Sequence, residues 1–261
     1  MNTFGKILST ALLGAALAVA PQVALAAPAA PAAQWSFTAA QQAANQKATG
    51  YKDVPSWYWG YTEGWTTYVT QHGLMSGTTT TAADGTSKPT GNFAPETSIT
   101  RGEVATVLYR IAHPGTKDTT FEANVGIKLD FTVQGDYIYY NKAINWAKSV
   151  GIVTGDTDGL GHQLGVFRPD DPITREELAT MIYRFAIWHG ADAIDLNTEA
   201  FYEAPDHNDV SIFARIPLKW TAAKGIMTGS KGPDGGKLLP HRDTKRAEAA
   251  KMFSVLDSKV L

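Results

Sequence analysis

The feature that most constrains this chain is a short motif that occurs three times. The copies are ITRGEVATVLYRI at 99–111, ITREELATMIYRFA at 173–186 and TKRAEAAKMFSVL at 244–256. Their arginines, Arg101, Arg175 and Arg246, are 74 and 71 residues apart along the chain. An internal repeat of this length predicts three similar units that bury their apolar faces against one another.

Each copy of the motif is expected to start a helix. Two copies contain a Thr-x-x-Glu box, in which the Thr hydroxyl and the Glu carboxylate satisfy backbone N–H groups of the first turn. These boxes are Thr100 with Glu103 and Thr174 with Glu177. Glu248 has the same place in the third copy, but Lys245 replaces the threonine. We therefore expect Asp243 or Thr244 to cap the third helix, or its first turn to fray, while Glu248 serves the same turn.

The residues upstream of the motif repeat as well. Each unit has a Gly-x-x-x-Gly spacing, an Asp-Gly turn signal and a proline six residues before the arginine. The glycine pairs are Gly73 and Gly77, Gly151 and Gly155, and Gly225 and Gly229. The first glycine of each pair predicts a helix end in the left-handed conformation. Each unit is therefore expected to run from a helix through a short apolar stretch and a proline-bearing loop into the capped helix.

The tryptophans divide into two groups. Trp146 and Trp220 lie five residues before a first glycine, on apolar helix stripes, so we expect both in the core. Trp57, Trp59 and Trp65 fall within nine residues and cannot all face one core stripe. One of these three is therefore expected at the surface, where an indole could stack on a sugar ring.

The amino terminus has the pattern of a secretory signal peptide. Lys6, the apolar run at 7–20, Pro21 and the Ala24-Leu25-Ala26 site predict a signal at 1–26, with cleavage after Ala26. We expect 27–47 to be an Ala/Pro-rich linker that can hold one short helix, too short for a second domain. The chain has no cysteine and no later apolar run of about 20 residues, so we expect no disulfide and no membrane span.

Charge and residue spacing exclude several classes of function. The net charge is −2, whereas nucleic-acid-binding proteins usually have a strongly basic face. The six histidines show no metal-ligand spacing, and GDTDG at 155–159 lacks the further ligands of a calcium loop, so we expect no metal or cofactor. The sequence has no nucleophile elbow and no His-Glu-x-x-His, and its notable carboxylates recur in capping positions, so we expect no enzyme.

Taken together, these motifs resemble the surface-layer homology (SLH) family. The resemblance rests on ITRGE, ITREE and TKRAE, the GIVTG-type stretches, and the openings KDV (52–54), LDF (129–131) and PDHNDVS (205–211). It covers about 48–258 and implies a mainly α fold in which three helix-loop-helix repeats form one pseudo-threefold domain. We refer to the expected repeats as segment 1 (48–115), segment 2 (120–189) and segment 3 (196–258).

The family resemblance also implies a function. SLH triplets typically anchor proteins to anionic secondary polysaccharides attached to peptidoglycan, often polysaccharides that carry pyruvate ketals. The resemblance therefore implies a secreted, non-catalytic anchor at the cell wall. The alternative is a structural subunit of a surface layer or envelope assembly that acts by self-association.

The motif arginines are the leading candidates for ligand binding. A cation at the first helical position is unfavourable, because the helix dipole is positive there. An anion held jointly by the guanidinium and by free N–H groups of the helix start would offset this cost. Arg101, Arg175 and Arg246 are therefore expected to bind a carboxylate in grooves between adjacent segments. The rival hypothesis gives each arginine an intramolecular Asp partner.

Three aspartates near the start of the segments are weaker candidates. Asp53, Asp130 and Asp206 recur in the opening motifs. We expect them chiefly to cap helices or to accept hydrogen bonds from loop N–H groups, because short carboxylates do this readily. They are also candidates to reach a ligand in the grooves.

Overall fold

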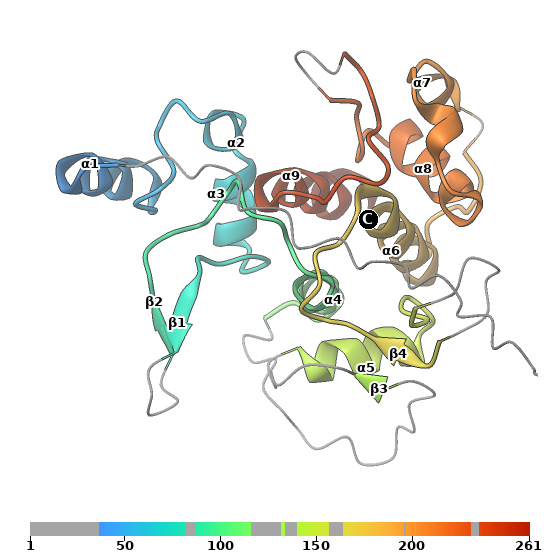
Figure 1. Ribbon diagram of the computed structural model, residues 1–261, viewed down its shortest axis with the longest axis horizontal. Coiled ribbons are helices and arrows are strands. Elements are labelled where there is room, and N and C mark those ends of the chain that lie inside the picture. The colour runs from blue at the N-terminus through green and yellow to red at the C-terminus, as the bar shows by residue number, and fades with distance from the viewer. Residues whose placement is uncertain are drawn as a thin grey trace, which may run out of the picture. The chain divides into compact units, whose positions relative to one another are not determined.

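The computed structural model describes residues 37–81, 87–115, 132–133, 140–156, 164–195, 197–230 and 235–261. All of these ranges belong to one compact unit, Ala32–Leu261. The expected signal peptide, most of the expected linker, Asp130 and the Asp-Gly pairs at 84–85 and 158–159 lie outside the described residues. The described part is mainly helical, which confirms the predicted fold class (Figure 1).

The helices and strands occur in the following order. The α-helices are α1 (Ala39–Thr49), α2 (Trp59–Thr62), α3 (Trp65–Gln71), α4 (Arg101–Ala112), α5 (Asn141–Ser149), α6 (Arg175–His189), α7 (Glu199–Tyr202), α8 (Arg215–Ala223) and α9 (Arg246–Val255). Short helical turns are η1 (His207–Asp209), η2 (Ile212–Ala214) and η3 (Leu256–Val260). Strands β1 (Thr79–Thr81) and β2 (Ser87–Pro89) pair antiparallel, with Thr79 opposite Pro89, and β3 (Thr132–Val133) and β4 (Val166–Phe167) pair parallel, with Thr132 opposite Val166.

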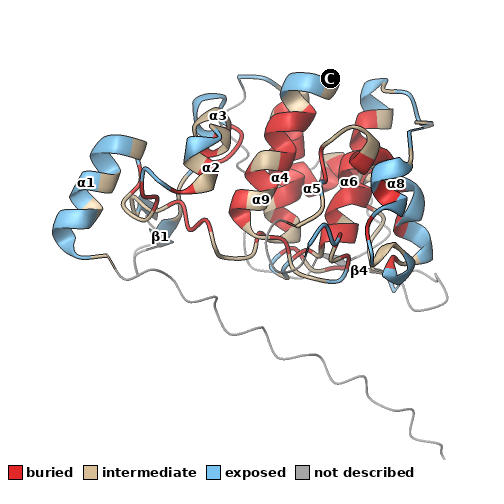
Figure 2. Ribbon diagram, turned by 90° about the horizontal axis from the view of Figure 1, so that it is seen from above, coloured by how far each residue is buried: buried red, intermediate tan, exposed pale blue. Residues whose placement is uncertain are grey.

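Helix α1 crosses the expected end of the linker. It begins inside 27–47, where a capping box joins Thr38 and Gln41, and it ends at Gly50 with φ 85°. Local capping signals at both ends extend this helix to Thr49, two residues past the expected end of the linker, and the linker boundary remains a prediction. None of its residues is buried, in contrast to α4, α6 and α9, whose residues are mostly buried (Figure 2).

The starts of the three motif helices follow the sequence closely. Both predicted capping boxes are present at α4 and α6. Helix α9 begins at Arg246, and Glu248 accepts the N–H of Lys245 at 3.1 Å. The expectation that Asp243 or Thr244 caps this helix, or that it frays, is wrong. The N–H groups of Arg246 and of the next residue instead donate to carbonyls of segment 1, at 2.8 and 3.0 Å.

A closed ring of backbone hydrogen bonds joins the residues just before the three motif helices. Ile173 N–H donates to Ile99 O at 3.1 Å, and Thr244 N–H donates to Ile173 O at 2.9 Å. Ile99 N–H completes the ring by donating to Thr244 O at 2.9 Å. Each participant therefore both gives and receives one bond, so these backbone groups are satisfied without a continuous sheet.

The helices pack in the same cyclic order. Helix α4 contacts α5, α6 contacts α8, and α9 contacts α3, so the last motif helix packs on the first part of the chain. The large side chains buried between them include Phe93, Phe167, Phe185, Trp220 and Phe253. These correspondences link the three segments in space, while their boundaries remain predictions.

Several local predictions are confirmed. The first glycines of the three pairs have left-handed φ values: 68° at Gly73, 79° at Gly151 and 66° at Gly225. Trp220 is buried in the core as expected, whereas Trp146 is only partly buried and packs against the core from its edge. Trp57 is the surface member of its cluster, and the residue is 66% exposed. No helix within the described residues has the length and apolar character needed to cross a membrane.

Candidate binding grooves

The three motif arginines each point at the capping glutamate of a different segment. Arg101 Nη1 lies 2.7 Å from Glu177 Oε1, and Arg246 Nη1 contacts Glu103 Oε1. Arg175 Nη1 lies 3.6 Å from Glu248 Oε2. The arginines therefore lie inside the molecule with carboxylate neighbours, and the carboxylates shared by all three are the capping glutamates rather than the aspartates of the rival hypothesis.

The first N–H groups of the motif helices are not available to a ligand. The N–H of Arg101 donates to Asp171 O at 3.0 Å, and the N–H of Arg175 donates to Arg242 O at 3.0 Å. The second N–H of each motif helix donates to the carbonyl of a loop proline: Pro169, Pro240 or Pro95. The expectation that these N–H groups bind an anion is therefore wrong, because the loop of another segment already occupies them.

The terminal nitrogens of Arg101 and Arg246 are all paired, although Arg101 Nε is buried without a hydrogen-bond partner. Arg101 Nη2 lies 3.0 Å from Asp156 Oδ1, and its guanidinium lies 4.9 Å from the centre of the Phe167 ring. Arg246 donates from Nε to Phe93 O at 2.9 Å and from Nη2 to Ser76 O at 3.0 Å. Both terminal nitrogens of each group thus have a partner within ordinary hydrogen-bond distance.

Arg175 is different, because its two terminal nitrogens have only long contacts. Its Nε donates to Leu238 O at 2.6 Å, whereas Nη2 is 3.4 Å from Thr228 O and Nη1 is 3.6 Å from Glu248. Glu248 is held instead by Arg242 Nη2 at 2.5 Å. The Arg175 side chain is only 4% exposed, and burial lowers its pKa. This buried cation is therefore weakly compensated by its own chain.

Arg175 lines a groove of about 440 Å³, which we call the Arg175 groove. Its lining residues are Trp59, Glu63, Arg175, Ile226, Thr228, Gly229, Ser230, Leu239, Arg242, Glu248, Lys251 and Met252. Three cations here face two carboxylates, Glu63 and Glu248. Two of its polar atoms, Ser230 Oγ and Arg242 Nε, are buried without a hydrogen-bond partner.

A second, larger groove of about 920 Å³ contains Arg101, and we call it the Arg101 groove. Its charged lining residues are Arg101, Asp156, Arg168, Glu176, Glu177 and Arg184. The three cations are thus matched by three carboxylates, and Asp156 contacts two of the arginines directly. The rim includes the exposed apolar side chains of Leu164, Ile212 and Phe213.

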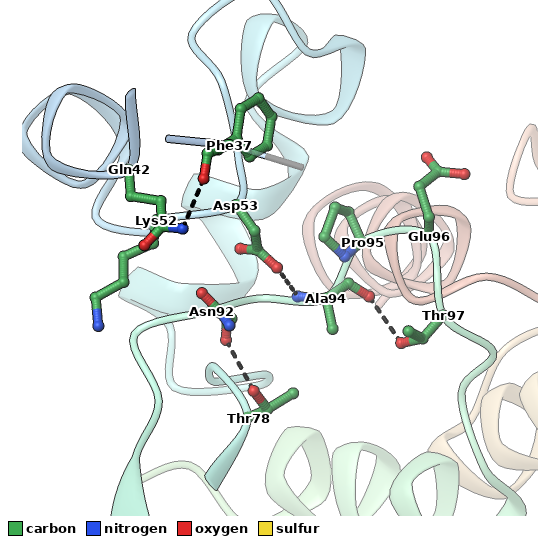
Figure 3. Close-up of a pocket in the computed structure, with 10 residues that line it drawn as sticks. All are labelled: Phe37, Gln42, Lys52, Asp53, Thr78, Asn92, Ala94, Pro95, Glu96 and Thr97. Carbon is green, nitrogen blue, oxygen red and sulfur yellow. Dashed lines mark hydrogen bonds between the residues drawn. The ribbon is translucent and has the colours of Figure 1, made fainter. Parts of the chain in front are cut away.

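The third pocket, of about 470 Å³, lies between the start of α1 and segment 1 (Figure 3). Its lining residues are Phe37, Gln42, Lys52, Asp53, Thr78, Asn92, Ala94, Pro95, Glu96 and Thr97. Arg246 is not among them, and the only cation in the lining is Lys52, opposite two carboxylates. This pocket therefore provides less positive charge for binding an anion than either arginine groove does.

The opening aspartates hold loops in place. Asp53 accepts the N–H groups of Phe93 and Ala94, both at 2.8 Å, and Figure 3 shows its carboxylate directed at Ala94. Asp206 accepts the N–H groups of Leu238 and Leu239 at 2.8 and 2.7 Å. Ala94 and Leu239 both have a left-handed φ, 57° and 52°, immediately before a proline. Each carboxylate thus stabilises a strained backbone turn, and a contact with ligand remains a prediction.

Sequence reasoning missed Arg242, Lys251 and Ser230, which supply two cations and a hydroxyl to the lining of the Arg175 groove. Arg242 occupies the place of Thr97 and Asp171, two residues after the loop proline. Comparison of the loops position by position would have found a cation unique to segment 3. Within the described part of the chain, no cluster of histidine, aspartate and glutamate side chains could hold a metal ion.

Asp243 next to the grooves makes stability depend on pH. Burial, followed by repulsion from Glu177, raises the pKa of its carboxyl above the usual 3.8. A carboxyl with a raised folded-state pKa contributes stability at low pH and loses it as the pH rises through that pKa. Asp243→Asn should therefore increase the free energy of unfolding at pH 7, by less than about 1 kcal/mol because the group is partly exposed.

Urea unfolding of wild type and Asp243→Asn at about pH 3, 5 and 7 measures this effect. The gain in the free energy of unfolding should disappear near pH 3, where the Asp243 carboxyl of the wild type is mostly protonated in both the folded and the unfolded state. A gain of the same size at pH 3 and pH 7 would contradict this origin.

Comparison with known proteins identifies the class of domain. The family model of the S-layer homology domain matches residues 133–179, so the chain contains an S-layer homology domain, and the family resemblance is confirmed within segment 2. The assignment of segments 1 and 3 as further repeats remains a prediction. This domain is a non-catalytic anchoring module, and the match supports a role in attachment to the cell wall.

Curated relatives share larger parts of the chain. An endoglucanase of Bacillus sp. (strain KSM-635) is 30% identical over 176 residues, 67% of this chain and 16% of the relative. Cell surface glycoprotein 1 of Acetivibrio thermocellus is 27% identical over 64% of this chain, and S-layer protein EA1 of Bacillus anthracis is 25% identical over 80% of it. The matches span only 7% and 20% of those two relatives.

Proposed function

We propose that this chain is a non-catalytic cell-wall anchor whose Arg175 groove binds an anionic secondary cell-wall polysaccharide attached to peptidoglycan. The observation that carries this proposal is the weak internal pairing of Arg175. A buried guanidinium whose terminal nitrogens have only long contacts is costly, and a bound carboxylate that accepts from both of them would remove that cost. The carboxylate of a pyruvate ketal has the required charge and two suitably spaced oxygens.

The rest of the groove suits a sugar acid. Arg242 and Lys251 add positive charge to its lining. Arg242 lies on the loop just before α9, and Lys251 lies on α9. Trp59, Ile226 and Met252 supply apolar surface in the same lining. A sugar ring has both apolar C–H faces and polar edges, so a groove with an aromatic side chain and several cations matches an anionic glycan better than a neutral apolar ligand.

The domain family and the relatives support the location. Two of the relatives are named as a cell surface glycoprotein and an S-layer protein. Together with the S-layer homology domain, these names support secretion and attachment at the cell wall or cell surface. The pyruvylated identity of the polysaccharide comes from the family resemblance alone.

Removal of two groove cations tests this proposal. The double variant Arg242→Gln/Lys251→Gln should pellet with purified bacterial walls at least about tenfold more weakly than wild type, because each charge-assisted hydrogen bond contributes about 1.5–3 kcal/mol. Loss of Arg242 also releases Glu248, which can then pair with Arg175 and fill the site from within. Wild-type binding should weaken as salt rises towards about 1 M.

The matched control is Arg215→Gln/Lys219→Gln, which removes the same charge from segment 3 at residues that line none of the three pockets. It should bind like wild type. An equal loss of wall binding in both double variants would indicate an effect of net charge and contradict specific binding in the Arg175 groove. Binding that survives chemical extraction of the secondary polysaccharide would contradict the polysaccharide ligand, and no pelleting by folded wild type would favour the self-associating alternative.

A further inference from the structure

We propose that Asp156 acts as a built-in substitute for the ligand carboxylate and closes the Arg101 groove to anions, whereas Ser230 leaves the corresponding position of the Arg175 groove open. This inference rests on the proposed function, since it assigns which groove takes the anionic group. It makes a single residue position decide whether a groove binds its ligand.

Asp156 already occupies the place that an anionic ligand would take beside Arg101. Its Oδ1 is 3.0 Å from Arg101 Nη2, and its Oδ2 accepts from Arg168 Nε at 2.7 Å. The carboxylate is only 9% exposed. One carboxylate thus bridges two guanidinium groups inside the groove, which is the arrangement expected of a bound acid. The hydrogen bond to Asp156 also raises the pKa of Arg168.

Ser230 has the equivalent position in segment 3. It follows Gly229 as Asp156 follows Gly155. The backbones also correspond: Asp156 N–H donates to Val166 O at 2.7 Å, and Ser230 N–H donates to Lys237 O at 2.8 Å. The two side chains therefore start from the same place in their grooves, so their different chemistry has a direct effect on the neighbouring arginine.

In the Arg175 groove, where Ser230 stands in place of the carboxylate, several polar groups lack close partners. Ser230 Oγ and Arg242 Nε are both buried and lack a hydrogen-bond partner. The terminal nitrogens of Arg175 are also left with their long contacts. Arg101 Nε is also buried without a partner, but both terminal nitrogens of Arg101 are paired, so the contrast lies in Ser230 Oγ and in the long contacts of Arg175. Buried polar atoms are normally paired closely, so these groups point to a ligand that supplies the acceptor atoms.

The corresponding position in segment 1 takes a third form. Thr78 N–H donates to Asn92 O at 2.7 Å, and its hydroxyl pairs with that of Thr90 at 2.6 Å. The nearby Arg246 is satisfied by Ser76 O and by Glu103. This position has neither an internal carboxylate nor an unpaired guanidinium, so the described grooves should give one anion site per chain.

Reciprocal substitution at the two positions tests the inference. The probe is a methyl hexopyranoside carrying a 4,6-O-(1-carboxyethylidene) ketal, and the neutral 4,6-O-isopropylidene analogue is the control ligand. Titration calorimetry should give one site for wild type and none for Ser230→Asp. Asp156→Ser should give two sites, and the double exchange Asp156→Ser/Ser230→Asp should give one. The neutral ligand should bind none of these proteins at the same concentrations.

A second variant protects the test from a folding defect. Asp156→Ala removes the carboxylate and empties the space that it fills, so it should also give two sites if Asp156→Ser does not fold. Unchanged binding in Ser230→Asp, or one site in folded Asp156→Ala, would overturn the inference while leaving the anchoring function intact. No binding of the acidic probe by wild type, together with full pelleting on walls, would instead overturn the anionic site of the proposed function.

Discussion

Replacement of Arg246 by alanine should lower the free energy of unfolding by about 3–5 kcal/mol. The guanidinium is buried, pairs with Glu103, and donates to the carbonyls of Phe93 and Ser76. Its loss leaves a carboxylate and two carbonyls partly buried without their donor. Because Arg246 comes from segment 3 and all of these acceptors come from segment 1, the variant should weaken the closure of the ring.

Urea denaturation followed by circular dichroism measures this loss. Arg215→Ala is the control, because it removes an exposed arginine on α8 and should change stability by less than about 1 kcal/mol. If Arg246→Ala lost no more than this control, the Arg246 pair would contribute only as much as a surface ion pair. Arg175→Ala should lower the free energy of unfolding by less than Arg246→Ala does, because the terminal nitrogens of Arg175 have longer contacts.

Gly229→Ala should destabilise the protein by about 3 kcal/mol and abolish binding in the Arg175 groove. A Cβ atom at this glycine would lie 2.2 Å from the carbonyl oxygen of Gly236. The loop must then move, which breaks the hydrogen bond from Gly236 N–H to Ser230 O at 2.9 Å. The movement also displaces nearby Leu238, whose carbonyl holds Arg175.

Gly225→Ala provides a matched control within the same Gly-x-x-x-Gly pair. Gly225 has a φ of 66°, and nothing lies within 4 Å of a Cβ placed there. This control should cost about 1–2 kcal/mol from backbone strain alone and keep its wall binding. Thermal unfolding and wall pelleting of both variants separate the two effects. Full binding by folded Gly229→Ala would show that the close approach of the two backbones is not required for the groove.

Local interactions made the helix starts predictable. Thr100 and Thr174 cap helices because their partners lie three residues away, so the sequence contains both members of each box. The same holds for the left-handed glycines and for the mainly helical class. The third helix start was predicted less well, because Lys245 replaces the capping threonine and the contacts with Thr97 and Pro95, about 150 residues away, are not visible in the local sequence.

The partners of the arginines were not predictable in the same way. Arg101 and Glu177 are 76 residues apart, and Arg246 and Glu103 are 143 residues apart. The recurrence of the motif marked these arginines as important, but equal motifs suggested equal roles. The structure separates the roles, because the residue after the second glycine is Asp156 in one groove and Ser230 in the other.

The sequence by itself determined the helix starts, the three-copy pattern and the resemblance to the S-layer homology family, because these features depend on residues close together in the chain. Only the tertiary structure decided which arginine has terminal nitrogens without close partners. The geometry of Arg175 depends on Glu248 and Arg242, which are brought to it by the packing of segment 3 against segment 2. A charge balance of that kind is a property of the folded ring, since each segment supplies the acceptors for the arginine of another.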